Sequence, residues 1–130
     1  MPKTASSAKV SFTVPLVPPS VNHYKMRTRK GVTFVSKEAI AFKEAVAVYG
    51  RGLHVEAEAY QVTAHIYLGL GQRGDLDNFL KCALDGLTAA NVIRSDAAVT
   101  KIIAEKFRDR ENPRTEFTIE AWGCTEGRAG

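Results

Sequence analysis

The sequence predicts a small α+β domain in which two helices pack on a mixed β-sheet. Residues 10–16 and 60–70 alternate apolar and polar side chains, as half-buried strands do. Residues 37–49 and 76–90 instead repeat apolar side chains at helical spacing. The order along the chain is strand, hairpin, helix, strand, helix and two further strands. In a chain of 130 residues, this order indicates one domain with two helices on a sheet.

The N-terminal elements are punctuated by prolines. Residues 1–8 are small and polar, and we expect them to form a flexible arm before a domain that spans residues 9–123. Pro15 confines the first strand to a sheet edge or ends it early. The run Pro18-Pro19-Ser20 forces a turn or an extended link. Residues 24–35, centred on Lys30-Gly31, are typical of a loose hairpin.

Local signals delimit the first helix at residues 37–49. Ser36 is a favourable N-cap, and Val35 and Ile40 occupy the positions of a hydrophobic staple around it. Gly50 then provides a stop signal. The apolar residues at helical spacing are Ala39, Phe42, Val46 and Tyr49.

The clearest strand leads through a glycine-rich turn into the second helix. The strand's inward face is predicted to hold Val62, Ala64, Ile66, Leu68 and Leu70. Residues 69–74 include three glycines and predict the turn. The helix then carries an apolar stripe, and Asn91 can end it in the left-handed conformation. The stripe consists of Leu76, Phe79, Leu80, Ala83, Leu84 and Leu87.

Two more strands close the domain. Residues 99–107 predict a strand with two mixed faces, and residues 108–114 predict the turn that follows it. In the last strand Phe117, Ile119 and Ala121 alternate with polar residues. We expect residues 124–130 to be a flexible tail.

Composition excludes several classes of protein. The chain is 45% hydrophobic and 25% charged, which excludes a wholly disordered or collagen-like chain. No apolar run approaches about 18 residues, so we expect no membrane partner. The start of the chain lacks the apolar segment of a signal peptide. Cys82 and Cys124 match no zinc-binding spacing, and we expect a reducing, cytoplasmic setting.

The net charge of +4 is unevenly distributed. Residues 1–54 hold nine Lys/Arg and two Asp/Glu, a balance of +7, whereas the remainder carries −3. The basic half peaks at residues 25–30. Such a concentration is typical of a surface that binds a polyanion. A solvated hairpin tip is an equally good explanation of this short basic segment.

A group of carboxylates is the most informative feature. Asp75 and Asp77 stand where the turn enters the second helix, and alternate side chains there can converge. Carboxylate oxygens on one side suit Mg²⁺ or Mn²⁺. Lys81 lies one helical turn beyond Asp77, so its ammonium can reach the same pocket, and Asp85 lies a further turn along.

Spacing alone also allows a purely structural role for these residues. Asp75 can cap the helix, and Asp77 and Lys81 can form an ordinary i,i+4 ion pair. A third acid, Asp96, follows the helix. Adjacent strand and helix ends could bring it toward the first two, but spacing does not decide this. An isolated Asp-x-Asp is a weak motif.

Several ordered motifs together resemble the RusA family of Holliday-junction resolvases, from about residue 14 to residue 122. The most specific are Asp75-Leu76-Asp77-Asn78 with Lys81, then Asp85-Gly86-Leu87 and Asp96. The proline-rich opening, residues 18–24, and Ser36 at the start of a helix also fit. The resemblance implies a homodimeric endonuclease that cuts four-way DNA junctions symmetrically, in DNA recombination and repair.

The resemblance also implies the roles of individual residues. Asp75, Asp77 and Asp96 would bind the metal, expected to be Mg²⁺ with Mn²⁺ as a substitute, beside an essential Lys81. No organic cofactor is expected. The chain departs from the family pattern at two places. Ser95 precedes Asp96 where two acids are frequent, and Gly74 precedes Asp75 where a basic residue is common.

Candidate DNA contacts come mainly from the basic half of the chain. For Tyr24, packing within a strand is the alternative to DNA contact. The candidate residues are Asn22, Tyr24, Lys25, Arg27, Arg29, Lys30 and, just before the carboxylates, Arg73. Two other functions remain open on the sequence. One is a metal-dependent nuclease for flaps or fork DNA, and the other is a DNA-binding module without catalysis.

Overall fold

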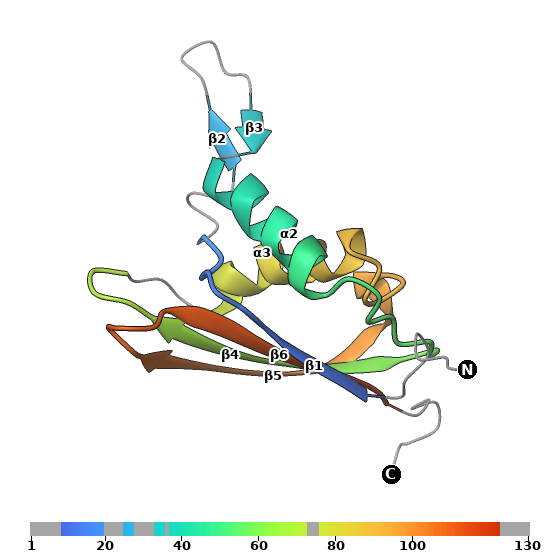
Figure 1. Cartoon of the computed structure of the whole chain (residues 1–130). Coiled ribbons are helices and arrows are strands. Elements are labelled where there is room, and N and C mark those ends of the chain that lie inside the picture. The colour runs from blue at the N-terminus through green and yellow to red at the C-terminus, as the bar shows by residue number, and fades with distance from the viewer. Residues whose placement is uncertain (1–8, 20–24, 28–32, 36, 73–75, 123–130) are drawn as a thin grey trace.

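The protein has two layers: a four-stranded sheet, and two helices that cover one of its faces (Figure 1). The computed structural model describes residues 9–19, 25–27, 33–35, 37–72 and 76–122. The expected arm and tail therefore lie outside the described residues. The elements are β1 (Lys9–Val14), β2 (Lys25–Arg27), β3 (Thr33–Val35), α2 (Lys37–Tyr49), β4 (Tyr60–Leu68), α3 (Leu76–Ala89), η2 (Asp96–Ala98), β5 (Val99–Arg108) and β6 (Arg114–Ala121). This is the predicted α+β domain.

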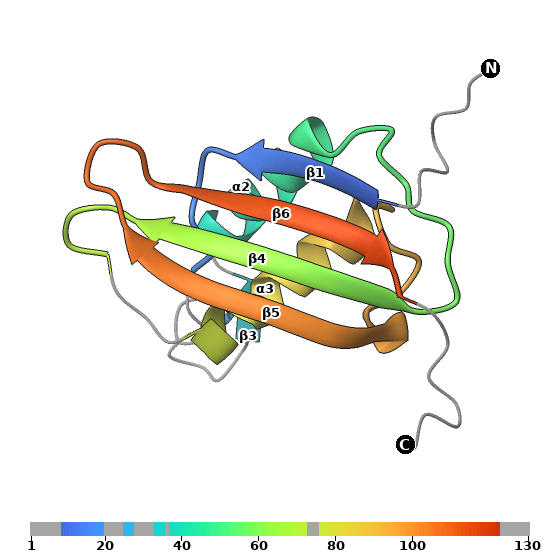
Figure 2. The ribbon, with the colours of Figure 1, turned by 90° about the horizontal axis from the view of Figure 1, so that it is seen from below.

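The sheet is mixed, with strand order β1-β6-β4-β5 (Figure 2). β6 pairs antiparallel with both β1 and β4, whereas β5 runs parallel to β4. A parallel neighbour requires a crossover, and here the chain passes through α3 between the two strands. β1 is an edge strand that ends at Val14, directly before Pro15, which confirms both effects expected of that proline.

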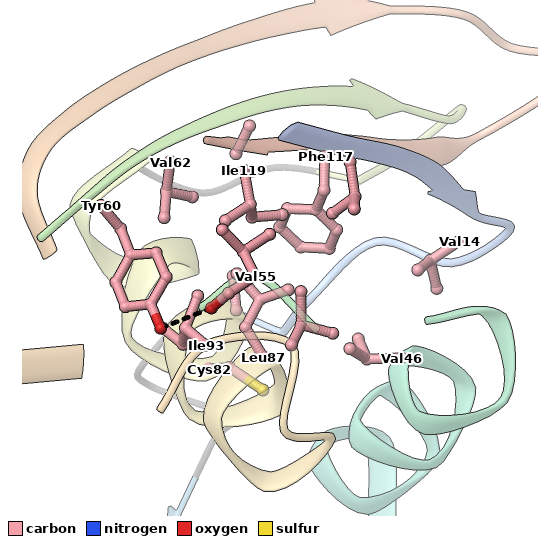
Figure 3. Packing of buried hydrophobic residues seen from close by; sticks show 14 of the residues in the cluster. Val14, Val46, Val55, Tyr60, Val62, Cys82, Leu87, Ile93, Phe117 and Ile119 are labelled. Carbon is pink, nitrogen blue, oxygen red and sulfur yellow. Dashed lines mark hydrogen bonds between the residues drawn. The ribbon is translucent and has the colours of Figure 1, made fainter. Parts of the chain in front are cut away.

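The core lies between the helices and the covered face of the sheet (Figure 3). Alternate residues of β4 and β6 point into it, because side chains alternate across a strand. From the helices, Phe42 and Val46 of α2 and Leu87 of α3 are fully buried. A smaller group, Ile66, Leu68 and Phe79, packs where β4 ends and α3 begins.

Most predicted elements are confirmed, and two side-chain placements are wrong. α2 has the predicted bounds, and Asn91 has the expected left-handed φ of 62° after α3. Tyr49, however, is 50% exposed, because the covered face of α2 ends at Val46. Leu70 is 78% exposed, because β4 stops at Leu68 and Leu70 lies in the following turn.

Gly50 follows α2 as predicted, but for a different physical reason. It does not adopt the left-handed conformation of a glycine stop. A Cβ there would lie 2.9 Å from the Val46 carbonyl oxygen and 3.1 Å from both Phe12 and Val92. Close packing, rather than backbone conformation, therefore requires glycine. The predicted N-cap, Ser36, lies outside the described residues.

The predicted hairpin is present as a separate two-stranded sheet. β2 and β3 pair antiparallel, with Arg27 opposite Thr33, and they lie beside the start of α2, away from the main sheet (Figure 1). Among the described helices, none has the length and apolar character required to cross a membrane.

Candidate active site

The predicted carboxylate segment begins where β4 leads into α3. Asp77 lies in the first turn of α3 with its side chain exposed, where a negative charge interacts favourably with the helix dipole. Phe79 is 1% exposed and packs with Ile66 and Leu68, which anchors this first turn to the end of β4. Arg73, Gly74 and Asp75 lie outside the described residues. Asp77 is therefore presented to solvent from a firmly packed helix start.

The turn before the carboxylate segment is held by β5. The Gln72 N–H donates to the Gly69 carbonyl at 3.1 Å, and the Gly69 N–H donates to Gln72 Oε1 at 2.6 Å. Arg108 Nη1 donates to both the Gly69 carbonyl, at 2.6 Å, and the Gln72 carbonyl, at 3.0 Å. Gly71 has a φ of 79°, which favours glycine. Sequence reasoning missed Arg108, because nothing in its spacing links it to a turn 36 residues earlier.

Lys81 and Asp85 follow Asp77 along α3. Lys81 Nζ lies 4.0 Å from Asp85 Oδ2, with 53% of the lysine side chain exposed. The ion pair found for Lys81 is thus with Asp85 rather than with Asp77. Such an exposed pair contributes little to stability. The ammonium is accessible to a ligand that approaches the start of α3.

The glycine of the Asp85-Gly86-Leu87 motif has a role in helix packing. A Cβ on Gly86 would lie 3.3 Å from Val46 Cγ2 of α2, closer than most side-chain contacts. The residue therefore permits the close approach of α2 and α3.

Cys82, four residues before Gly86 on α3, is fully buried, and burial raises the pKa of its thiol to about 12. The thiol stays protonated at neutral pH, as expected of a packing residue rather than a nucleophile.

Asp96 lies at the far end of the sheet from Asp77. It begins η2, directly before β5, and Val99 of β5 is paired with Tyr60 at the start of β4. α3, by contrast, begins beyond the other end of β4, so its first turn and η2 lie at opposite ends of the sheet (Figure 2). The 14 residues of α3 alone span about 20 Å. One chain does not bring Asp96 to Asp77.

Hydrogen bonds hold the Asp96 segment in place. The Arg94 N–H donates to the Tyr60 hydroxyl at 3.1 Å, and the Arg94 guanidinium donates to the carbonyls of Ala57, at 3.0 Å, and Glu58, at 2.7 Å. Ser95 caps η2 by accepting the Ala97 N–H at 3.0 Å. Ser95 therefore has a structural role directly before Asp96.

Within the part of the chain that the structure describes, no three Asp, Glu, His or Cys side chains lie close enough to hold a metal ion. Asp75 lies outside that part. Carboxylate oxygens are suitable donors for Mg²⁺, so the chemistry of the predicted set is appropriate. Its geometry within one chain is incomplete, because Asp96 is remote.

The candidate DNA-contact residues are only partly described. The backbones of Lys25 and Arg27 lie on β2, in the predicted hairpin. Asn22, Tyr24, Arg29 and Lys30 lie outside the described residues, as does Arg73.

Two histidines, His54 and His65, lie in the described part of the chain, and both make ordinary polar contacts. His65 Nε2 lies 3.1 Å from a Glu105 carboxylate oxygen on the uncovered face of the sheet. His54 Nδ1 lies 2.7 Å from the Asn91 carbonyl oxygen, and its Nε2 lies 2.9 Å from Glu56. These contacts, the one to Asn91 first, raise the pKa of His54.

Comparison with known proteins identifies the class to which this fold and these acidic residues belong. The family model described as Endodeoxyribonuclease RusA matches residues 15–120, which include every element of the main sheet apart from β1 and the end of β6. The class is that of nucleases that cut DNA within a strand. The chain belongs to the RusA endodeoxyribonuclease family.

Curated relatives match over nearly their whole length. The Crossover junction endodeoxyribonuclease RusA of Escherichia coli K12 is 33% identical over 116 residues, covering 87% of this chain and 95% of the relative. A protein of the same name from Enterobacteria phage 82 is 31% identical over 109 residues, covering 82% and 90%. The protein from Shigella sonnei Ss046 is 31% identical over 116 residues, covering 87% and 95%.

Proposed function

We propose that this chain is a Mg²⁺-dependent endonuclease that resolves four-way DNA junctions by paired symmetric cuts, in DNA recombination and repair. One observation carries the proposal: relatives that the chain covers over 90–95% of their length are named crossover junction endodeoxyribonucleases. The acidic start of α3 and the exposed Lys81 supply residue types that such a reaction uses.

The proposed catalytic residues act on a phosphodiester that already carries negative charge. Mg²⁺ bound by Asp75, Asp77 and Asp96 would neutralise part of this charge and lower the pKa of a bound water. Mn²⁺ has the same preference for oxygen ligands and is expected to substitute. Lys81 would stabilise the negative charge that develops on the phosphate, as a preorganised donor does. No covalent nucleophile is required.

The proposed homodimer accounts for the remote position of Asp96. Paired cuts in two strands require two catalytic centres, and a chain of 130 residues has an expected radius of gyration of only about 14 Å. Because Asp77 and Asp96 lie at opposite ends of the sheet, we propose that the second copy supplies Asp96 to each centre. Each site would then be complete only in the dimer.

The test is incubation with labelled four-way junction, flap, fork and linear duplex DNA, with and without Mg²⁺. We expect paired nicks in the junction, only with metal. Asp77→Asn should lose cleavage by at least about 100-fold while junction binding is kept or improved, because a negative charge near DNA is removed. Glu44→Gln, an exposed neutralisation on α2, is the matched control and should cut normally.

Three results would contradict the proposal. Preferential cutting of flaps or forks would indicate a different branched substrate. Metal-insensitive junction binding without any product would indicate a DNA-binding module without catalysis. Normal cleavage by Asp77→Asn would show that the carboxylate assignment is wrong.

A further inference from the structure

Arg108, the last residue of β5, contacts the turn that leads to the carboxylates. In the β4–β5 register it lies opposite Leu68, the last residue of β4, so both strands stop at the same end of the sheet (Figure 2). Its Nη1 donates to the Gly69 carbonyl at 2.6 Å and to the Gln72 carbonyl at 3.0 Å. A terminal guanidinium nitrogen carries two hydrogens, one for each carbonyl. One charged group therefore bridges the two ends of the turn from Gly69 to Gln72.

The contacts from Arg108 differ in kind from the turn's own hydrogen bonds. Gly69 and Gln72 bond to each other twice, through the Gln72 N–H at 3.1 Å and through Gln72 Oε1 at 2.6 Å. Those two bonds set the shape of the turn, but they lie within it and do not fix its position on the sheet. Arg108 donates from a different strand, and bonds from a charged donor are shorter and stronger than neutral ones. Arg108 therefore fixes the position of Gln72 relative to β5.

The chain is held on both sides of the short segment that carries Asp75. Gln72 lies three residues before Asp75, and α3 begins at Leu76 directly after it. On the α3 side, Phe79 is 1% exposed and packs on the end of β4. On the other side, Arg108 holds Gln72. Three residues span at most about 10 Å, so a shift of Gln72 is passed on to Asp75.

We propose that Arg108 is a positioning residue for Mg²⁺ binding: it fixes Gln72, and through Gln72 it sets where Asp75 stands relative to Asp77. This role deepens the proposed function and rests on the assignment of Asp75 as a metal ligand. Mg²⁺ demands near-ideal octahedral geometry, so displacing one carboxylate weakens its binding. Groups that orient metal ligands without touching the metal typically contribute about 10–100-fold to metal affinity.

Arg114, which follows the next turn, provides a matched comparison. Its guanidinium donates to the Asp109 carboxylate at 2.9 Å and to the Asn112 carbonyl at 3.0 Å. It also donates to Glu116 at 2.9 Å. These partners lie in β6 and in the turn that joins it to β5, at the same end of the sheet as Arg108. Loss of Arg114 thus disturbs the fold nearby without releasing the turn before the carboxylates.

The experiment measures Mn²⁺ binding by the full-length chain without DNA, from the loss of the electron paramagnetic resonance signal of free Mn²⁺. Asp75→Asn defines the loss expected when a ligand is missing. Arg108→Gln should raise the dissociation constant for Mn²⁺ about tenfold, because the turn is no longer held. Arg114→Gln should leave this constant unchanged, although both arginine variants should lower the urea midpoint of unfolding.

Cleavage and DNA binding provide a second readout. The Mg²⁺ concentration for half-maximal junction cleavage should rise about tenfold in Arg108→Gln, whereas the rate at saturating Mg²⁺ should approach that of wild type. Arg108 is exposed, so a direct contact with a DNA phosphate is the alternative role. Such a contact would weaken metal-free junction binding in Arg108→Gln, which the positioning role leaves unchanged.

Each outcome supports or overturns the positioning role. An Mn²⁺ affinity of Arg108→Gln equal to that of wild type would overturn it and leave the proposed function standing. An equal loss of affinity in Arg114→Gln would overturn it by attributing the effect to general destabilisation. Weaker metal-free junction binding with normal Mn²⁺ affinity would make Arg108 a DNA contact instead. Wild type that binds Mn²⁺ no better than Asp75→Asn would overturn the metal assignment of the proposed function, and the role of Arg108 with it.

Discussion

Tyr60 joins three segments at the end of the sheet where Asp96 lies. Its side chain is fully buried, and its hydroxyl donates to the Val55 carbonyl at 2.7 Å (Figure 3). The same hydroxyl accepts the Arg94 N–H at 3.1 Å, two residues before Asp96. Tyr60→Phe removes one oxygen atom and leaves the packing of the ring in place. The change therefore isolates the two hydrogen bonds.

The expected cost follows from those two bonds. A hydrogen bond contributes about 0.5–1.5 kcal/mol net, and a buried group left without a partner costs about 1–3 kcal/mol. The Val55 carbonyl belongs to a buried residue, whereas Arg94 is at the surface and water can replace part of its bond. We expect Tyr60→Phe to lower the free energy of unfolding by about 2 kcal/mol. For a domain of this size, Tm should fall by roughly 6–12 °C.

The assay is urea unfolding followed by circular dichroism, with junction cleavage measured below the transition. Tyr49→Phe is the control, because Tyr49 is 50% exposed on α2 and its hydroxyl can be hydrated. We also expect slower cleavage by Tyr60→Phe, since the segment before Asp96 loses an anchor. A stability loss below about 0.5 kcal/mol, indistinguishable from the control, would refute this account of the Tyr60 hydroxyl.

Two further predictions concern pH and packing. The raised pKa of His54 means that the imidazole holds its proton more tightly in the folded state than in the unfolded state. The protonated His54 therefore stabilises the fold below about pH 6.5, and this stabilisation is lost as pH rises through the folded pKa. The stability difference between wild type and His54→Gln should therefore be larger at about pH 5.5 than at about pH 8.5, and equal differences would contradict the mechanism. Gly69→Ala should destabilise the turn before the carboxylates by about 1–3 kcal/mol, because its Cβ would lie 2.7 Å from Pro113 Cγ. The same change in a Pro113→Ala background should cost clearly less, and additive losses in the double-mutant cycle would exclude this contact as the cause.

Local patterns were sufficient to predict the elements. α2 has its predicted bounds, and the apolar stripe of α3 packs as expected, because periodic side chains bury one face wherever a helix packs on a sheet. Asn91 was predicted to be left-handed from its position alone, since few other residues tolerate that conformation. The prediction that Leu70 faces the core was wrong, because apolar and polar residues go on alternating in the sequence after the strand has ended. The turn from Gly69 to Gln72 places the Leu70 side chain in solvent.

By itself, the sequence determined the α+β class and the order of the elements. It also placed Asp77 and Lys81 one turn apart at the start of the second helix. These follow from interactions between residues close in the chain, which leave a periodic or short-range signature. The tertiary structure alone decided which distant residues meet. It set Arg108 against the turn at Gly69, and it placed Asp96 at the opposite end of the sheet from Asp77. The direction of β5 relative to β4 depends on how strands pair in space, and no pattern within one strand encodes that choice.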